Sequence, residues 1–402
     1  MPLRLIRFAV ATLAILLLAP AMALAQNPYV VADVASGAVL AHNKAFKRWY
    51  PASVTKVMTA RLAFKAVRSG DLSMKSPVRM TKRAAKEPPS KMGYPVGTVL
   101  TLDNALKIIL VKSANDVAMA IGEAVAGSEM EFVAMMNEEA RALGMSDTRF
   151  ANPNGLPDGK QYTTARDLAL LAVATRRDFP EFAGFFALEG IEAGGKLIPN
   201  YNILLGRFAG ADGMKTGYVC ASGFNLAASA TRGGRTIVAV VLGALTQEDR
   251  ADLAADLLAQ GFATDPAGKP TLANLQPYGE DRERVADIRG SICTQKAQQA
   301  RYDGRDFDGK LVYRSSHLGP MNREPVAVAV APGGATGPAA ANTVFADVPV
   351  PTPRPGDAPA MAFARQGSAP GEAEEPARPA VTSQLRGVPA PGIPVPTPRP
   401  SI

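Results

Sequence analysis

A serine and a lysine three positions apart, Ser53 and Lys56, are the first residues whose types and spacing could do chemistry. They begin a stretch with helical spacing, Val54 to Gly70, where this separation places two side chains one turn apart on the same face. A hydroxyl beside an amine is the pair that a serine nucleophile with a lysine base requires. Lys56 can serve as the base only if burial or a neighbouring cation lowers its pKa. The pattern alone also fits a capped helix with a surface lysine, so it needs support elsewhere.

Two further patterns could complete such a site. Ser113-Ala114-Asn115 interrupts the apolar helical segment from Leu102 to Gly127, which suggests a loop between helices, either an ordinary one or one directed into a cleft. Lys215-Thr216-Gly217 precedes the strand-like stretch YVCASGFNL. Its glycine lets a substrate backbone lie close to a strand edge, its threonine can donate to a carboxylate, and its lysine is a plausible cation near Lys56.

The composition of the chain argues against several other chemistries. Among 402 residues there are only two histidines, His42 and His317, so a Ser-His-Asp relay or a His-built metal cage is not expected. With only two cysteines as well, almost nothing is left to build a His- or Cys-based metal site. The net charge is +8, but the Lys and Arg residues are scattered and not interleaved with aromatic residues. Nucleic-acid binding is not predicted. The charge fits either a basic surface facing an anionic envelope polymer or membrane, or an ordinary solvated surface.

The N-terminus predicts export. Arg4 and Arg7 precede an apolar run from Phe8 to Leu18, and a small-x-small pattern ends at Ala25. We expect a signal peptide over residues 1–25, cleaved near Ala25, and a mature protein in the periplasm or cell envelope. In an oxidising compartment the two cysteines, Cys220 and Cys293, form either one disulfide or two buried thiols, and their spacing does not decide between these.

The order of elements predicts an α+β domain over residues 26–265. Tyr29–Asp33 and the residues from Val39 suggest an opening hairpin, and the stretch from Phe224 to Leu242 suggests a late pair of strands. Between and after them the spacing of apolar residues predicts further helices, at Met130 to Gly144, Thr163 to Arg177 and Asp249 to Ala263. We expect the first and last segments to share one antiparallel sheet.

The C-terminal third has a different composition. Residues 266–321 are polar with few apolar anchors and predict an irregular lobe, which Cys293 could pin to the domain. Residues 322–402 hold about half of the 33 prolines and predict a disordered Pro/Ala-rich tail. The sequence PVPTPRP occurs there twice, from Pro349 and from Pro394, which favours polyproline II as a stiff spacer or as a docking peptide for an envelope partner.

The ordered set SVTK, SAN and KTG resembles the penicillin-binding serine hydrolases. Longer stretches resemble the D-alanyl-D-alanine carboxypeptidases in particular, across residues 28 to 263: YPASVTKVMTA, KSANDVA, ALGMSDTRFANPNGLPD, TTARDLALLA and DGMKTGYVCASGFNLAASA. The resemblance implies a β-lactamase/DD-peptidase-like fold, an antiparallel sheet flanked by helices with a mostly helical second lobe. It implies a serine peptidase acting on peptidoglycan stem peptides, with β-lactams as covalent inhibitors that acylate Ser53. It implies no metal and no organic cofactor.

The resemblance also implies a role for each site residue. Ser53 would be the acylated nucleophile, Lys56 its general base, and Ser113 the relay of a proton to the leaving D-alanine. The substrate-binding residues would be Asn115 at the substrate amide, Lys215 and Thr216 at its carboxylate, and Gly217 and Tyr218 along its backbone. The backbone N–H groups of Ser53 and Tyr218 would form the oxyanion hole.

Three alternatives use the same residues or fold. A DD-endopeptidase that cleaves peptidoglycan cross-links is poorly separated by sequence. A class A β-lactamase is less favoured because its deacylating glutamate is missing, with no glutamate between Glu139 and Glu181. A non-catalytic peptidoglycan-binding scaffold is disfavoured by the presence of both Ser53 and Lys56. The segment after Pro266 shows neither the β-rich second domain nor the amphipathic helix of many relatives, so membrane attachment is not predicted.

Overall fold

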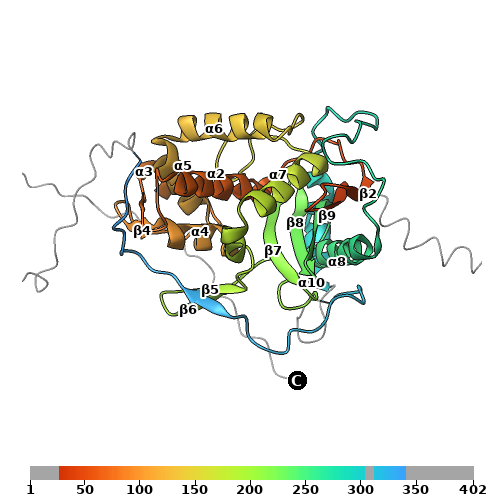
Figure 1. The fold of residues 1–402 in the computed structure, drawn as a ribbon. Coiled ribbons are helices and arrows are strands. Elements are labelled where there is room, and N and C mark those ends of the chain that lie inside the picture. Colours follow the sequence, from red (N-terminus) through yellow and green to blue (C-terminus); the bar gives the residue numbers. More distant parts are fainter. Residues whose placement is uncertain (1–26, 304–311, 341–402) are drawn as a thin grey trace, which may run out of the picture. The chain divides into compact units, whose positions relative to one another are not determined.

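A computed structural model describes residues 27–303 and 312–340 of the chain (Figure 1). A five-stranded antiparallel sheet in the order β2-β1-β9-β8-β7 lies beside a lobe of helices. Its strands are β1 (Tyr29–Asp33), β2 (Val39–Asn43), β7 (Ala211–Val219), β8 (Gly223–Arg232) and β9 (Arg235–Ala244). β1 pairs with β9, so the first and last segments share one sheet. The expected α+β fold is confirmed.

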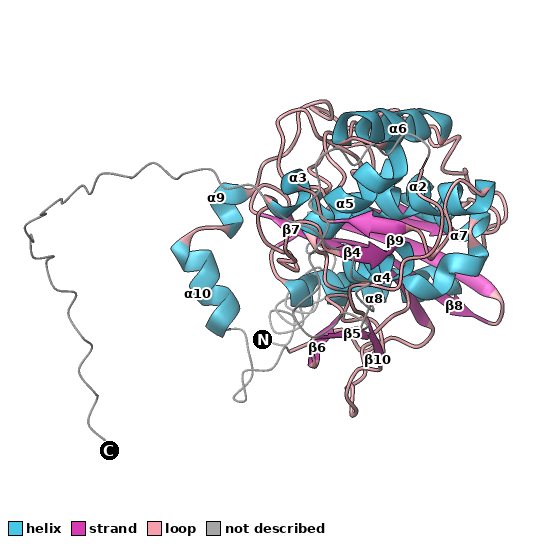
Figure 2. Ribbon diagram, turned by 90° about the vertical axis from the view of Figure 1, so that its left-hand side faces the viewer, coloured by secondary structure: helices cyan, strands magenta, loops and turns pink. Residues whose placement is uncertain are grey.

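Helices lie on both sides of the sheet, as the turned view shows (Figure 2). The longer ones are α2 (Lys56–Ser69), α4 (Leu102–Val111), α5 (Asn115–Ala126), α6 (Glu129–Ala142), α7 (Ala165–Asp178) and α8 (Gln247–Ala263). Short helical turns are η1 (Ala52–Thr55), α3 (Lys82–Ala85) and η2 (Pro180–Phe185). The helices that the spacing of apolar residues predicts are all present, and Thr164 caps α7 by accepting the backbone N–H of Asp167.

Two apolar cores sandwich the sheet. Along β9, Val238 and Val240 face the core shared with α7 and the helical lobe, while Ile237 and Val241 face the core under α8. Side chains alternate across a strand, so a strand covered on both faces must be apolar at every position. This is why β9 is a continuous apolar run in the sequence. The sheet is thereby a rigid base for whatever its edge strand β7 carries.

The structure corrects the predicted strand after Lys215-Thr216-Gly217. These three residues lie inside β7 rather than before a strand, and the chain turns at Cys220–Ser222 before β8 begins at Gly223. The Ser222 N–H donates to the Val219 carbonyl at 3.0 Å and closes the turn. A stretch of small residues with a glycine at φ 68° is as compatible with a tight turn as with a strand. Of the two alternatives left open for the cysteines, the structure has the disulfide between Cys220 and Cys293.

The predicted start of the disordered tail is wrong for residues 322–340. This segment contributes β10 (Ala327–Ala329), parallel to β5 (Gly190–Ala193), which pairs in turn with β6 (Lys196–Pro199). Val330 is buried, and the Asn104 side chain donates to the Ala331 carbonyl at 2.9 Å. Backbone hydrogen bonds to an open sheet edge order a segment whose composition offers few large apolar side chains. A further two-stranded antiparallel sheet, β3 (Pro77–Arg79) with β4 (Val99–Thr101), was also not predicted.

The segment after α8 is largely irregular, as predicted, with two short helices, α9 (Arg289–Ile292) and α10 (Gln295–Asp303). Within residues 27–303 and 312–340, none of the helices combines the length and apolar character needed to cross a membrane. The predicted signal peptide and both PVPTPRP repeats lie outside the described residues. So do residues 304–311 of the predicted lobe.

A pair of matched substitutions tests whether residues 322–340 belong to the folded domain. Val330→Asn places an amide where the side chain is 4% exposed, whereas Val326→Asn changes a side chain that is 64% exposed. We expect Val330→Asn to destabilise the protein by about 2 kcal/mol, because it loses apolar burial and buries a polar group. The midpoint of thermal unfolding should fall by about 4–8 °C in this variant and stay within about one degree in the control. Equal midpoints would show that the segment does not pack on the domain.

Candidate active site

Ser53 and Lys56 meet at the junction of η1 and α2. Ser53 lies in η1 and Lys56 is the first residue of α2, so their side chains are one turn apart on one face, as the spacing predicts. The distance between Lys56 Nζ and Ser53 Oγ is 3.0 Å. The Lys56 side chain is completely buried. The serine hydroxyl and the amine are therefore close enough for direct proton transfer.

The buried amine has two further partners from distant parts of the chain. Lys56 Nζ donates to Asn115 Oδ1 at 2.8 Å and to the Asn154 carbonyl at 2.6 Å. Both acceptors suit the charged and the neutral amine, since each form retains at least two N–H groups. The contact to Ser53 is the one that can reverse direction, with the hydroxyl donating when the amine is neutral. The geometry thus leaves one route for the serine proton.

Burial lowers the pKa of Lys56 well below its ordinary value, and the positive charge of Lys215 lowers it further. The carboxylates of Glu87 and Asp116 act in the opposite direction. Lys215 is itself buried, and burial together with the charge of Arg250 lowers its pKa to about 7. The condition that the sequence sets for a lysine base, burial and a neighbouring cation, is met.

Ser113 and Asn115 lie where α4 gives way to α5. Ser113 has a left-handed backbone with φ 63°, and both side chains line a cleft in front of Ser53. Asn115 is held from both ends, since its N–H donates to the Ser90 carbonyl and its Nδ2 to the Pro88 carbonyl. The predicted interruption is therefore a loop between helices that faces a cleft, and its asparagine is positioned before any ligand arrives.

Gly217 brings the edge strand β7 against the start of α2. A Cβ at this position would lie 2.9 Å from the backbone nitrogen of Ser53, closer than a side chain can approach. Only glycine therefore allows this contact. On either side of it, Thr216 and Tyr218 line the cleft, while Lys215 is 1% exposed and its Nζ donates to the Thr216 carbonyl at 3.1 Å. Thr216, Gly217 and Tyr218 thus form a wall of the cleft, and Lys215 contributes a buried charge.

Arg250 is a site residue that sequence reasoning missed. It comes from the first turn of α8 and lines the cleft while 3% exposed. Its guanidinium donates to the Tyr201 carbonyl at 3.1 Å, and its Nε has no hydrogen-bond partner among the described residues. Burial lowers its pKa to about 10, so it remains a cation at neutral pH. No local motif marks a lone arginine in a helix; only the fold brings it to the cleft.

Glu87 and Asn154 were also missed, and they fix the environment of the amine. Asn154 Nδ2 donates to Glu87 Oε2 at 2.9 Å, while its carbonyl accepts from Lys56. The loop around Asn154 needs Gly155, which has φ 85° and whose Cβ would lie 1.9 Å from the Ala52 carbonyl oxygen. Both residues stand next to Pro or Gly in loops, so the sequence offered only a turn signal.

The cleft has a volume of about 390 Å³, within the range of small-molecule sites. It brings together seven of the eight predicted site residues with Arg250: the cleft lining includes Ser53, Ser113, Asn115, Thr216, Gly217 and Tyr218, and Lys56 lies directly behind Ser53. Lys215, the eighth, lies behind the wall and acts through its charge. In the part of the chain that the structure describes, no group of three or more His, Cys, Asp or Glu side chains could hold a metal ion.

The sequence matches a family model described as D-alanyl-D-alanine carboxypeptidase, Peptidase_S11, over residues 18–246. It is 35% identical over 241 residues to the D-alanyl-D-alanine carboxypeptidase DacC of Escherichia coli, covering 58% of this chain and 60% of that protein. It is 36% identical over 219 residues to DacF of Bacillus subtilis, covering 54% and 56%. The chain therefore spans less than two thirds of the length of these two relatives.

Solved structures of similar proteins share the fold. DacD from Francisella tularensis matches with a TM-score of 0.57 and 30% identity, covering 58% of this chain and 70% of that one. Penicillin-binding protein 5 from Haemophilus influenzae matches with a TM-score of 0.57 and 33% identity, covering 60% and 71%. Penicillin-binding protein D2 from Listeria monocytogenes, in a cefotaxime-bound form, matches with a TM-score of 0.54 and 29% identity, covering 59% and 96%. The expected DD-peptidase-like fold is confirmed.

Two glycines of one loop provide a test of how the Asn154 carbonyl is held. Gly155→Ala places a methyl group into the Ala52 carbonyl in a left-handed backbone, whereas Gly159→Ala meets nothing within 4 Å. We expect Gly155→Ala to cost at least about 2 kcal/mol of stability, and Gly159→Ala to be neutral or slightly stabilising. Thermal unfolding of the two variants measures this. An unchanged midpoint for Gly155→Ala would contradict the close packing of this loop on η1.

Proposed function

We propose that this chain, which belongs to the D-alanyl-D-alanine carboxypeptidase family Peptidase_S11, removes the terminal D-alanine from peptidoglycan stem peptides. The reaction would proceed through an acyl-enzyme on Ser53. The observation that carries the proposal is the buried Lys56 amine, 3.0 Å from Ser53 Oγ and beneath a cleft with a cationic wall. A carboxylate-ended peptide fits a cleft with a buried guanidinium on one side and a nucleophile on the other.

Acylation begins when Lys56 accepts the Ser53 proton. Ser53 Oγ then attacks the carbonyl carbon of the penultimate D-alanine, and its oxygen becomes an oxyanion. The backbone N–H groups of Ser53 and Tyr218 are proposed to hold that charge, in the place where β7 approaches η1 most closely. Removing one such donor typically raises the barrier by about 3 kcal/mol, so the position of β7 matters as much as the base.

Collapse of the oxyanion breaks the peptide bond to the terminal D-alanine. The leaving nitrogen needs a proton, and Ser113, on the opposite side of the cleft from β7, is proposed to relay it from the Lys56 ammonium. Thr216 and Arg250 are proposed to bind the terminal carboxylate, with Lys215 adding positive potential from behind the wall. Asn115, already fixed by the carbonyls of Ser90 and Pro88, is proposed to orient the substrate amide.

Water then attacks the ester carbonyl while Lys56 accepts a proton from it, and Lys56 passes that proton to Ser53 Oγ as the bond between the acyl carbon and Ser53 Oγ breaks. A β-lactam carries a strained amide and a carboxylate in a similar arrangement, so it is proposed to acylate Ser53 as a substrate mimic. Support comes from penicillin-binding protein D2 of Listeria monocytogenes, which is described in ampicillin-bound and cefotaxime-bound forms. The residues of the proposed mechanism all lie within the proposed catalytic domain, 26–265.

The periplasm is the proposed location. The signal peptide predicted over residues 1–25 is the basis for this, and the Cys220–Cys293 disulfide supports an oxidising compartment. The relatives named above are carboxypeptidases and penicillin-binding proteins. Peptidoglycan, the proposed substrate, lies in the same compartment as an exported enzyme.

Ser53→Ala tests the proposed nucleophile. The variant should release no free D-alanine from a purified pentapeptide muropeptide and should not be labelled by fluorescent penicillin, because alanine cannot form the ester. Ser69→Ala, at the exposed end of the same helix α2, is the matched control and should behave like the unmodified protein. Labelling that persists in Ser53→Ala would overturn the assignment. The endopeptidase alternative would be favoured if the unmodified protein released monomers from cross-linked dimers but no D-alanine from pentapeptides.

Two charge changes should shift the pH dependence in opposite directions. Penicillin labelling rises with pH as Lys56 loses its proton. Lys215→Met removes a cation that lowers the pKa of Lys56, so the pH at which the labelling rate is half-maximal should increase. Glu87→Gln removes an anion that raises the pKa of Lys56, so the pH of half-maximal labelling should decrease. At a pH below the half-maximal value, penicillin should label Lys215→Met more slowly than the unmodified protein by about tenfold or more. Labelling rates measured from pH 5 to 10 give both shifts, and shifts of the same sign would contradict Lys56 as the base.

A further inference from the structure

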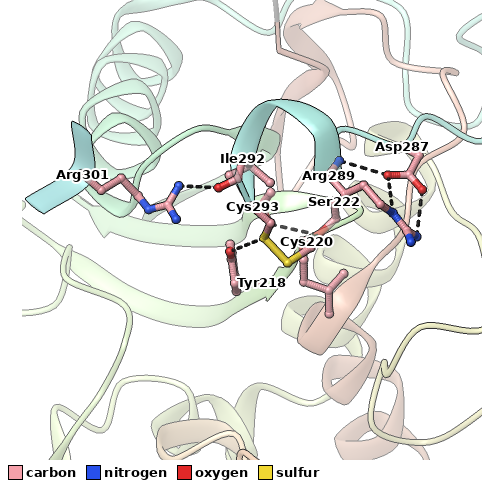
Figure 3. Close-up of a disulfide and its surroundings, with 10 residues drawn as sticks. Tyr218, Cys220, Ser222, Asp287, Arg289, Ile292, Cys293 and Arg301 are labelled. Carbon is pink, nitrogen blue, oxygen red and sulfur yellow. Dashed lines mark hydrogen bonds and ion pairs between the residues drawn. A yellow bond between two sulfur atoms is a disulfide. The ribbon is translucent and has the colours of Figure 1, made fainter. Parts of the chain in front are cut away.

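The turn between β7 and β8 is covalently tied to a segment beyond the family match. Cys220 follows the last residue of β7, and Cys293 follows α9; their Cα atoms are 5.6 Å apart (Figure 3). The family model ends at residue 246, so Cys293 and α9 lie in a part of the chain that it does not describe. The bridge therefore joins the strand that walls the cleft to an element outside the matched region.

The segment that carries Cys293 is seated on the domain by backbone hydrogen bonds. The Arg48 N–H donates to the Arg282 carbonyl, and the Ala286 N–H donates to the Arg48 carbonyl, both at 3.0 Å. The Ile288 N–H donates to the Ala221 carbonyl inside the turn itself, also at 3.0 Å. Ile292 is fully buried. The turn thus has α9 packed on it, and the disulfide closes that contact.

The sulfur of Cys293 also touches a residue of the cleft. Tyr218 Oη lies 3.2 Å from Cys293 Sγ, and Figure 3 shows the Tyr218 side chain directed toward the bridge. The Tyr218 ring lies against Phe224, with ring centroids 4.4 Å apart, and both rings line the cleft. The Arg250 guanidinium is 5.7 Å from the Phe224 ring centroid. A continuous row of contacts runs from the bridge through two rings to the cation of the cleft.

We propose that the Cys220–Cys293 bridge positions the Tyr218 ring as a wall of the substrate cleft, so that the bridge contributes to peptide affinity. The inference rests on the proposed function, because it assigns Tyr218 to the wall along which the stem peptide lies. Tyr218 is 39% exposed and is limited on one side by Phe224 and on the other by Cys293. Without the bridge, the sulfur of Cys293 is no longer fixed against Tyr218 by a covalent bond. Peptide binding must then restrict the motion of the ring, which lowers affinity.

The catalytic groups themselves do not depend on the bridge. Ser53 and Lys56 are set by α2 and the Asn154 loop, and β7 is held by its pairing with β8 from Ala211 to Val219. Loss of the bridge should therefore raise KM and leave kcat nearly unchanged. A purely structural staple would show a different pattern, a lower melting temperature with both kinetic constants retained by the molecules that remain folded.

The test compares Cys220→Ser/Cys293→Ser with the unmodified protein in D-alanine release from a peptide ending in D-Ala-D-Ala. We expect KM to rise by about five- to tenfold and kcat to change by less than about twofold. Saturating penicillin should still label every molecule. Leu258→Ala, in the core under α8 two turns beyond Arg250, is the control for lost stability and should leave KM unchanged. An unchanged KM in the double serine variant, or a rise of KM in Leu258→Ala as well, would overturn the proposal.

A double-mutant cycle with Tyr218→Ala tests whether the bridge acts through this ring. The effects of Tyr218→Ala and of the double serine variant on KM should be markedly less than additive, because both remove the same wall. Additive effects would overturn the link to Tyr218. If the serine variant does not fold, a dithiol reductant applied to the folded protein gives two thiols and its own cyclic disulfide, and the rise in KM should reverse on reoxidation. An unmodified protein that releases no D-alanine would refute the proposed function instead.

Discussion

The burial of the Lys56 amine against Ser53 is the constraint on which the rest of the site depends. A buried ammonium is costly, so the amine must either find acceptors for all its N–H groups or give up its proton. The structure provides for both: Asn115 and the Asn154 carbonyl satisfy two N–H groups in either form, and the serine takes the third contact. Each of these acceptors requires its own support, and those supports are the α4–α5 loop and the loop around Gly155.

The charges around the amine form two groups with opposite effects on the pKa of Lys56. Lys215 lowers the pKa of Lys56, whereas Glu87 and Asp116 raise it and keep the region from carrying an excess of positive charge. Arg250 in turn lowers the pKa of Lys215. The cations lie toward β7 and α8, where a carboxylate would bind, so the groups that tune the base also serve substrate recognition. Binding an anionic peptide would favour the charged form of Lys215. Peptide affinity and the protonation state of Lys56 would then be linked.

The parts of the site that lie close in sequence could be predicted, and those that depend on packing could not. Ser53 and Lys56 share one helical turn, and Gly217 stands inside a motif, so local spacing together with the order of the three motifs identified them. Glu87 and Arg250 are single charged residues whose function comes from long-range packing, which periodicity does not report. The composition of residues 322–340 wrongly predicted disorder, because β10 is ordered by hydrogen bonds to β5 rather than by its own side chains. In the same way the turn at Cys220 escaped notice, since small residues suit a strand and a turn equally.

The central claim is that the fold lowers the pKa of Lys56 so that it can take the proton of Ser53. The most direct measurement is an NMR titration of the lysine side chains, with the Lys56 signal assigned by its absence in Lys56→Arg. Burial and Lys215 predict that Lys56 loses its proton at a pH well below that of the lysines in the urea-unfolded chain, which should titrate near the ordinary value of about 10.4. A Lys56 midpoint equal to or above that of the unfolded chain would contradict the assignment of Lys56 as the base.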